Sequence, residues 1–285
     1  SGVTGGAGFT VSFIDVGQGD AALLHDPTGC NILIDGGKPS AGPTVVSHLH
    51  NQGVSQIDAM IATHADSDHI GGLIDVLQTG DISVTQVLYN GRGDASSTWN
   101  SFVGAVVAKG LTLTVAHWPL TYTWCAIQAQ VLNPSPLEPY DNDNDASVVL
   151  LAQHDATRYL FTGDISSDVD VSIIQRIPLL PIDVLKVSHH GSAYASSATF
   201  LALTHPSSAV ISVGPNSYGH PAAETLARLS NSGAHIYRTD LSGTITLHDS
   251  ASYTHFVYLP VVAAPPAPMP GYNVRCVQNG NAQMC

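Results

Sequence analysis

Apolar side chains recur along the chain in short runs separated by polar turns, and the spacing within each run predicts its secondary structure. Near the start, the runs are apolar or alternating and are divided by glycine-rich segments, which is the pattern of strands joined by tight turns. Three strands are predicted, within FTVSFIDV (9–16), DAALLHD (20–26) and CNILIDGG (30–37). The chain therefore begins as a sheet.

Helical and strand patterns alternate after this opening sheet. A helix is predicted over 41–52, a buried strand over 57–63, and a further helix from His69 that is capped by Asp68 or a neighbour. Strand, helix and strand follow in VTQVLYN, TWNSFVGAVVAKG and LTLTVAHW, and then strand patterns in WCAIQAQVLN, SVVLLAQH and TRYLFTGD. The second half returns to alternating helices and strands and ends in two strands near 235–248.

Both halves thus supply strands followed by amphipathic helices. Two sheets stacked face to face, with the helices outside, bury the apolar faces of both sheets. We therefore predict an α/β protein, a four-layer αββα sandwich, in one domain over residues 1–259. A proline-rich stretch follows, which is typical of an extended connector, so residues 260–285 are predicted to be a linker and a cysteine-containing tail without a catalytic part.

The charge balance narrows the range of partners. Nine basic residues oppose 22 acidic ones, for a formal net charge of −13, and the basic residues are thinly spread. Proteins that hold long nucleic acid by its phosphates usually carry a basic stripe, so a long nucleic acid is a disfavoured partner. No stretch reaches about 18 uninterrupted apolar residues, so no membrane span is predicted in this chain.

The four cysteines, Cys30, Cys125, Cys276 and Cys285, lack the paired spacing of zinc ribbons. Their even number and the low lysine content are typical of an exported or extracellular protein with one or two disulfides. Buried free thiols are the alternative.

The segment THADSDHIGG concentrates the chemistry-bearing side chains. His64 directly follows a predicted strand, so its imidazole is expected at the edge of a sheet, and Asp66, Asp68 and His69 lie on the turn into the next helix. Clustered imidazoles and carboxylates are the usual ligands of Zn²⁺ or a similar transition ion. The two glycines that close the segment would let the turn sit close under an ion or a substrate. A polar loop with solvated histidines is the alternative.

Further ligands are expected at the ends of other predicted strands. Asp164 ends one strand, His189 and His190 follow another, and Asp145 precedes a third. Asp35, at the end of the third opening strand, is expected to orient a histidine ligand or simply to end that strand in a turn. The candidate groups therefore gather at one edge of the predicted sheets.

Seven motifs occur along the chain in a fixed order: FIDVGQGDAALL, LIDGG, THADSDHIGG, NDASVVL, LFTGD, LKVSHHGS and NSYGHP. With these motifs the chain resembles the metallo-β-lactamase-fold hydrolases, and among them the soluble domain of ComEC-type DNA-uptake competence proteins. The motifs are spread from about residue 9 to about residue 250. The usual family loop reads His-x-His-x-Asp-His, and Asp66 stands in the place of the second histidine, as it also does in the competence-type branch.

The resemblance implies a ligand set for two divalent ions. It consists of His64, Asp66 and Asp145 for one ion, Asp68, His69 and His189 for the second, and Asp164 as a bridge between both. It also implies that Asp68, His190 and His220 take part in the reaction, with His190 supporting a ligand or facing the substrate. His220 would hydrogen-bond a substrate oxygen or leaving group, and a turn histidine before Pro221 is the alternative.

The expected chemistry is hydrolysis. Four carboxylates around one cleft would repel strongly, and two divalent cations would cancel their charge. The many oxygen ligands make Mn²⁺ a competitor to Zn²⁺. Two such ions about 3.5–4 Å apart can hold a bridging hydroxide near neutral pH.

Three functions remain open at this stage. The first is a metal-dependent phosphodiester hydrolase, nuclease-like or phosphodiesterase-like, which the charge restricts to small or short substrates. The second is a hydrolase of a carbon ester, lactone, thioester or β-lactam, since a fold does not decide a substrate. The third is a non-catalytic binding module that its metals only stabilise. The oligomeric state is not predicted.

Overall fold

The computed structural model describes residues 8–177 and 181–249, together with the backbone of 275–278 and 281–284. The chain divides into two units, residues 1–250 and 251–285. In the second unit, β17 (Arg275–Gln278) and β18 (Asn281–Met284) form an antiparallel pair. The boundary predicted at residue 259 and the proline-rich connector lie outside the described residues.

The first unit contains two seven-stranded sheets. The first sheet has the order β16-β1-β2-β3-β5-β7-β8. Its strands are β16 (Ile245–His248), β1 (Thr10–Phe13), β2 (Ala22–Asp26), β3 (Cys30–Ile34), β5 (Ala59–Ala62), β7 (Val87–Tyr89) and β8 (Leu113–Val115). The first four form antiparallel pairs, and from β3 onward the strands pair in parallel.

The second sheet has the order β15-β14-β13-β12-β11-β10-β9. Its strands are β15 (His235–Arg238), β14 (Ser208–Ile211), β13 (Val184–Lys186), β12 (Thr157–Phe161), β11 (Val149–His154), β10 (Ile127–Asn133) and β9 (Thr121–Trp124). Strands β12 to β15 pair in parallel, whereas β9 to β12 pair antiparallel. A short parallel pair, β4 (Gln56–Ile57) with β6 (Ser83–Val84), stands apart from both large sheets.

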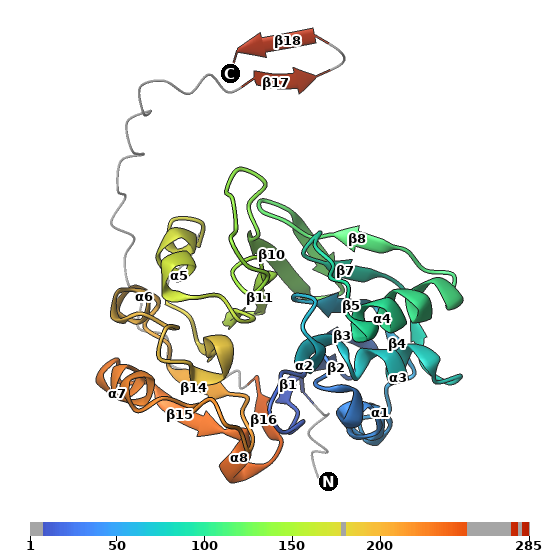
Figure 1. Cartoon of the computed structure of the whole chain (residues 1–285), viewed down its shortest axis with the longest axis horizontal. Helices are drawn as coiled ribbons and strands as arrows, with labels where there is room; N and C mark the ends of the chain where they lie inside the picture. The colour runs from blue at the N-terminus through green and yellow to red at the C-terminus, as the bar shows by residue number, and fades with distance from the viewer. Residues whose placement is uncertain (1–7, 178–180, 250–274, 279–280, 285) are drawn as a thin grey trace, which may run out of the picture. The chain divides into compact units, whose positions relative to one another are not determined.

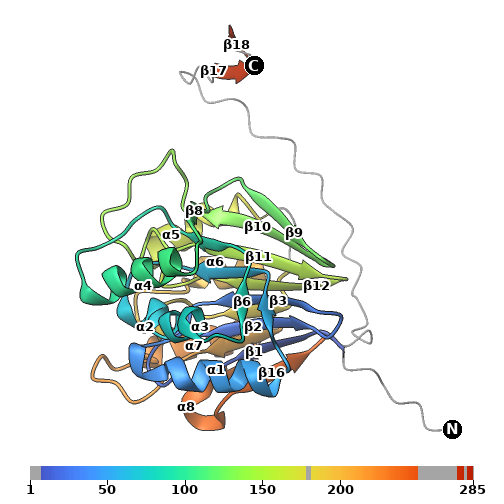
Figure 2. The same ribbon diagram turned by 90° about the vertical axis from the view of Figure 1, so that its right-hand side faces the viewer.

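The helices lie on the outer faces of the two sheets (Figures 1 and 2). Against the first sheet lie η1 (Pro39–Ala41), α1 (Gly42–Asn51), α2 (Ser67–Ile70), α3 (Leu73–Gln78) and α4 (Ser97–Ala108). With the second sheet lie α5 (Ser167–Ile174), η2 (Ser188–Gly191), α6 (Ala198–Thr204), α7 (Ala223–Asn231) and α8 (Thr239–Ser242). The predicted four-layer αββα sandwich is confirmed.

Three buried clusters hold these four layers together. The central one joins the two sheets face to face, with Phe13 and Ile32 from the first sheet and Phe161 from the second. The outer two lie between each sheet and its helices, around Leu49 and Phe200 respectively. Each such side chain contributes about 1.5–3 kcal/mol through burial, so the sandwich rests on apolar packing along its whole length.

Two predicted elements differ in detail from the observed ones. The helix expected from His69 is interrupted at Gly71 and Gly72, so that α2 ends at Ile70 and α3 begins at Leu73. Its N-cap position is Asp66, which makes no side-chain capping bond. The strand expected over 124–133 is the end of β9, a tight turn and β10.

A disulfide joins the two sheets at one end of the sandwich. Cys30, the first residue of β3, is bonded to Cys125 in the turn between β9 and β10, with a Cα–Cα distance of 6.2 Å. The bond spans a sequence separation of 95 residues. Of the other predicted partners, Cys285 lies outside the described residues, as does the side chain of Cys276. Within the described part of the chain, no helix is both long enough and apolar enough to cross a membrane.

Candidate metal centre

The polar side chains meet where parallel strands of both sheets end. His64 follows β5, and Asp35 follows β3, the strand that pairs with β5 in parallel. Asp164 follows β12, and His190 follows β13, which is again a parallel neighbour. Parallel strands direct their carboxyl ends to the same edge of a sheet. Both sheets therefore contribute to one site, and we call this end of the sandwich the site edge.

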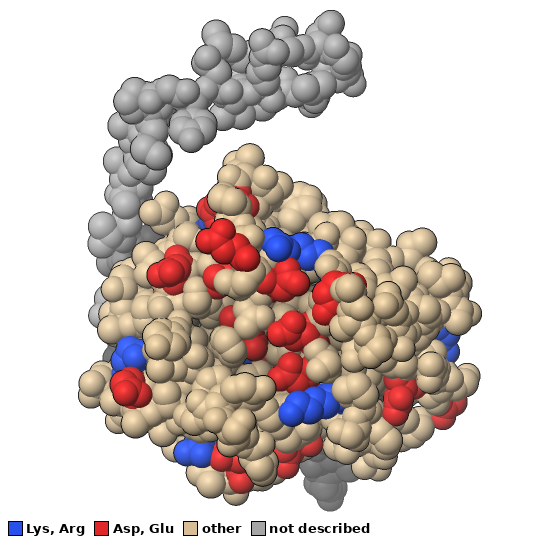
Figure 3. All heavy atoms as spheres, viewed as in Figure 1, with Lys and Arg blue, Asp and Glu red and all other residues tan. Residues whose placement is uncertain are grey.

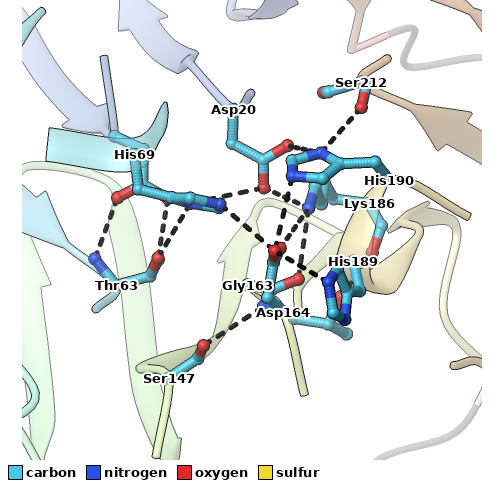
Figure 4. Close-up of polar contacts among 12 residues, drawn as sticks. Asp20, Thr63, His69, Ser147, Gly163, Asp164, Lys186, His189, His190 and Ser212 are labelled. Carbon is cyan, nitrogen blue, oxygen red and sulfur yellow. Dashed lines mark hydrogen bonds and ion pairs between the residues drawn. The ribbon is translucent and has the colours of Figure 1, made fainter. Parts of the chain in front are cut away.

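A central cluster at the site edge consists of His64, Asp68, His69, Asp164 and His190. In Figure 4, His69 and His190 point from opposite sides toward the carboxylate of Asp164. Both Nε2 atoms lie 3.3 Å from Asp164 Oδ2. His190 Nε2 is also 3.7 Å from Asp68 Oδ2, and the rings of His64 and His69 are 4.0 Å apart.

The cluster presents buried polar atoms that lack hydrogen-bond partners. They are the Nε2 atoms of His64, His69 and His190 and the Oδ1 atom of Asp164. An unsatisfied buried polar atom costs about 1–3 kcal/mol. Two overlapping groups, His64 with His69 and Asp164, and Asp68 with His69 and His190, each bring their ligand atoms within 4.8 Å of one another. This donor set of imidazoles and carboxylates fits divalent transition ions.

The opposite nitrogen of each histidine is fixed by a neighbour. His69 Nδ1 lies 2.8 Å from Asp35 Oδ2, and His190 Nδ1 donates to the carbonyl of Ser212 at 3.0 Å. His64 Nδ1 lies 3.1 Å from the hydroxyl of Thr63, which itself donates to Asp35. In the neutral imidazole with its proton on Nδ1, the Nε2 lone pair is directed into the cluster, which is the tautomer that a metal ligand needs.

Asp35 occupies the position expected of a residue that orients a ligand. Its side chain is 1% exposed, and it also accepts from the backbone amide of Thr63 at 2.9 Å. One carboxylate thus fixes both the ring of His69 and the turn that leads to His64.

A buried ion pair that was not predicted from the sequence lies behind the cluster. Lys186, on β13, pairs with Asp20, and its Nζ lies 3.7 Å from Asp164 Oδ1 (Figure 4). Asp20 Oδ1 in turn lies 3.3 Å from His190 Nδ1. Both side chains of the pair are buried. The signal was available, since a lysine inside the apolar run IDVLKVS needs a buried partner.

Glycines bring two loops of the site edge into contact. A Cβ at Gly19 would lie 2.4 Å from the carbonyl oxygen of Asp68, which accepts from the amide of Asp20 at 3.1 Å. A Cβ at Gly72 would lie 2.0 Å from the carbonyl oxygen of Gly36. The close approach that we expected Gly72 to allow toward an ion or a substrate is, in this structure, an approach to another segment of the chain.

Electrostatics couples the members of the cluster. Burial acts to lower the pKa of His69, but the carboxylates of Asp164 and Asp35 outweigh it and hold that pKa well above its usual value. For His190, burial is likewise outweighed by Asp164 and Asp20, and the pKa rises to about 9. Burial alone would raise the pKa of Asp164, but His190 and His69 hold it well below its usual value. A divalent cation would therefore compete with protons for these histidines.

The adjacent histidines His189 and His190 differ in burial and in their distance from Asp164. His189 and His190 both adopt left-handed backbone conformations, with φ of 50° and 52°, which cost about 1–3 kcal/mol each. His190 is buried inside the cluster, whereas His189 is half-buried, and its Nε2 lies 3.9 Å from Asp164 Oδ2. The geometry favours His190 over His189 as the histidine placed to share an ion with Asp68 and Asp164.

Asp145 and Asp66 lie at the margin of the central cluster. Both oxygens of Asp145 accept hydrogen bonds, from the amide of Ser166 at 2.8 Å and from the side chain of Asn142 at 2.9 Å. Asp145 belongs to none of the groups of potential ligands found among the described residues. Asp66 is half-buried, and its carboxylate lies 3.6 Å from His64 Nε2.

His220 borders the cluster from a separate loop. Its ring lies 5.5 Å from that of His189 and 6.4 Å from that of His190, measured between centroids. Its Nδ1 is buried without a hydrogen-bond partner. Burial lowers its pKa, and so do the neighbouring His189 and His190. His220 is therefore neutral near pH 7 and able to exchange a hydrogen bond with a bound molecule.

Comparison with known proteins places this geometry in a family. The family model described as the metallo-beta-lactamase superfamily matches residues 14–214. ComE operon protein 3 of Bacillus subtilis is 30% identical over 254 residues, which is 82% of this chain and 32% of that protein. Competence protein ComA of Neisseria gonorrhoeae is 31% identical over 82% of this chain and 31% of its own length. The chain thus spans about a third of the length of these relatives.

Solved structures share the fold at low sequence identity. The crystal structure of a diphosphatase from the PhnP family has a TM-score of 0.54 and 14% identity, and the match covers 85% of this chain and 98% of that one. An identity this low supports the fold alone.

Proposed function

The chain belongs to the metallo-β-lactamase superfamily, whose fold is that of metal-dependent hydrolases, and on that premise we propose that it hydrolyses phosphodiesters with two divalent ions, Zn²⁺ or Mn²⁺. The observation that carries the proposal is the convergence of three buried Nε2 atoms on the carboxylates of Asp164 and Asp68. Neutral histidine and ionised carboxylate are ligands of such ions.

His64, His69 and Asp164 would hold one ion, and Asp68, His190 and Asp164 the other. When bound, a pair of divalent ions acidifies water to give a nucleophile near neutral pH and stabilises charge on the oxygens of the reacting group.

The residues around the ions would position them and the substrate. Asp35 holds the ring of His69, and Lys186 fixes Asp20 behind His190. His220 is neutral and borders the cluster, so it is placed to hydrogen-bond an oxygen of the substrate.

Phosphodiesters are favoured as the substrate for two reasons. The relatives at 30% and 31% identity carry names that refer to the ComE operon and to competence, and the resemblance to DNA-uptake proteins points to nucleic acid. A fold neighbour that is named as a diphosphatase from the PhnP family indicates that this fold supports chemistry at phosphorus. Because the net charge is −13, we propose a small or short substrate rather than long duplex DNA.

We also propose that the chain works in an exported or extracellular location. The disulfide between Cys30 and Cys125 supports this, because disulfides persist in oxidising compartments.

The test is hydrolysis after reconstitution with Mn²⁺ or with Zn²⁺. We expect turnover of bis(p-nitrophenyl) phosphate by the wild type, and a loss of about 100-fold or more in Asp164→Asn. The matched control is Asp168→Asn, which changes an exposed carboxylate on α5 and should leave turnover unaffected. Cleavage of nitrocefin or of a lactone without phosphodiester turnover would replace the proposed substrate by a carbon ester or lactam. Metal-dependent stability without any hydrolysis would indicate a binding module.

A further inference from the structure

A row of aromatic rings leads from the central cluster to the surface. The ring centroids of His69 and His190 are 5.4 Å apart, those of His190 and His220 are 6.4 Å apart, and those of His220 and Tyr218 are 5.6 Å apart. Tyr218 ends the row and is 72% exposed. An aromatic face is thus open to solvent within two ring contacts of a predicted metal ligand.

The loop that carries Tyr218 is held by one side chain. Asn216 Oδ1 accepts from the amides of Tyr218 and His220, at 3.0 and 3.1 Å. Asn216 Nδ2 donates to the carbonyls of Gly214 and His220, both at 2.8 Å. Because these bonds fix the backbone on both sides of Tyr218, the ring is presented at a low entropic cost for binding.

Both ends of this loop are anchored to the segments that build the site. At its start, a Cβ at Gly214 would lie 2.4 Å from the carbonyl carbon of Gly17, in the loop that leads to Asp20. At its end, the amide of Ala222 donates to the carbonyl of Gly191 at 2.8 Å, directly after His190. Tyr218 therefore has a fixed position relative to the central cluster.

Charge near the site argues against recognition of a substrate through its phosphates alone. Acidic side chains gather over the middle of the face seen in Figure 3, around the position at which Figure 1 shows α2, and basic ones are few there. The cation buried at the site edge, Lys186, is already paired with Asp20. Binding of a polyanion next to such a surface needs a contact other than phosphate to cation.

We infer that Tyr218 is a stacking platform for the nucleobase next to the scissile phosphodiester, so that the substrate is single-stranded nucleic acid or a short fragment of it. Every base offers a ring face, and stacking on an exposed aromatic side chain binds single strands with little dependence on sequence. In a duplex the bases are stacked on one another, so their faces are not free to stack on the ring of Tyr218. This inference rests on the proposed phosphodiester chemistry, which places the phosphate at the ions and a neighbouring base at Tyr218.

The test compares Tyr218→Ala with Tyr218→Phe in the metal-reconstituted full chain. A short oligothymidylate is the substrate, and the same oligomer with abasic sites and its duplex are the controls. Tyr218→Ala should raise KM for the oligothymidylate about 5- to 150-fold, the loss expected for one stacked base. It should leave kcat within a few fold and should not change KM for the abasic oligomer. Tyr218→Phe should behave as wild type, because the ring face is retained.

Tyr194→Ala is the matched control, since Tyr194 is 80% exposed on the loop after η2, and no aromatic ring of the described residues lies against it. It should leave KM unchanged, and an equal rise in both variants would overturn the inference. Unchanged KM in Tyr218→Ala, with the wild type active, would overturn the platform and leave the proposed function intact.

Equilibrium binding of a labelled oligothymidylate separates the two proposals. Binding that weakens in Tyr218→Ala without any cleavage by the wild type would support the platform and reject the phosphodiesterase. The absence of both binding and cleavage would reject both.

Discussion

Strand β3 connects two ends of the sandwich, one held by a disulfide and the other lined with buried polar groups. Its first residue, Cys30, forms the disulfide with Cys125, and the residue that follows its last, Asp35, orients His69. At the disulfide end, apolar side chains such as Trp124 and Ile127 surround the junction of the sheets. At the site edge, carboxylates, imidazoles and a lysine are buried together.

The contrast between the two ends shows that the groups suited to chemistry and the covalent cross-link lie in different parts of the sandwich. Buried charges and the left-handed backbone of His189 and His190 cost free energy at the site edge. The cross-link at the other end closes a loop with a separation of 95 residues, and such loops gain the most from closure in the chain-entropy model. The site edge thus holds the buried charges, and the opposite end holds the covalent cross-link.

The largest expected effect is a difference in turnover between two variants at the site edge, His190→Ala and His189→Ala. Because His190 Nε2 lies in the cluster and His189 is half-buried at its margin, His190→Ala should reduce turnover about 100-fold or more, and His189→Ala about 10-fold or less. Metal affinity, measured by competition with a chelator, should fall in the same order. A larger loss in His189→Ala would reverse the assignment of the ligand.

The next effect tests whether the site edge also contributes to stability. Lys186→Met leaves Asp20 and Asp164 buried without their cation, which should lower the free energy of unfolding of the metal-free protein by about 3–5 kcal/mol. Adding Asp20→Asn should recover part of the loss, since it removes one of the orphaned charges. Denaturant unfolding of both variants measures this. A midpoint like that of the wild type in Lys186→Met would show that the pair is not a stabilising element.

A somewhat smaller effect is expected at the opposite end. Replacing Cys30 and Cys125 together by alanine should lower the free energy of unfolding by about 2–5 kcal/mol. KM and kcat should not change below the unfolding temperature, since neither residue contacts the cluster. Reduction of the wild type with dithiothreitol should give the same loss. Impaired catalysis in the folded double variant would break the separation of the two ends.

The smallest effect concerns Asp170, a buried carboxylate on α5 outside the central cluster. Burial raises the pKa of Asp170 to about 6, although it accepts from the amide and the hydroxyl of Ser197. A raised carboxyl pKa means that the folded state binds the proton more tightly, so stability falls as the pH rises from about 4 through about 6. Relative to the wild type, Asp170→Asn should gain up to about 3 kcal/mol between pH 4 and pH 7.5.

Urea unfolding at both pH values measures this gain, and Glu224→Gln, which changes an exposed carboxylate on α7, is the control. If the free energy of unfolding depended on pH equally in Asp170→Asn and in the wild type, the raised pKa of Asp170 would be contradicted.

Much of this architecture was predictable because local spacing encodes it. The alternation of short apolar runs and helical patterns predicted both sheets, and the position of His64 and Asp164 directly after strands predicted a shared edge. Which of the two adjacent histidine rings, His189 or His190, is buried in the cluster was not predictable, because it depends on two left-handed residues. The hydrogen bonds of Asp145 to Asn142 and Ser166 arise from loop geometry that no spacing reveals.

The ion pair between Asp20 and Lys186 shows the other limit. Lys186 lies on β13 of the second sheet, whereas Asp20 lies in the loop before β2 of the first sheet, far away in the sequence. A buried lysine signals that some partner exists, but only the stacking of the two sheets identifies which one.

The central claim is that the cluster around Asp164 holds a pair of divalent ions. Its most direct test is the metal content, by inductively coupled plasma mass spectrometry, of protein reconstituted with Mn²⁺ or Zn²⁺ and freed of excess metal. We predict about two ions per chain in the wild type and at most one in Asp164→Asn, with both proteins folded. A wild type that retains no ion, or an Asp164→Asn variant that retains as many as the wild type, would contradict the claim.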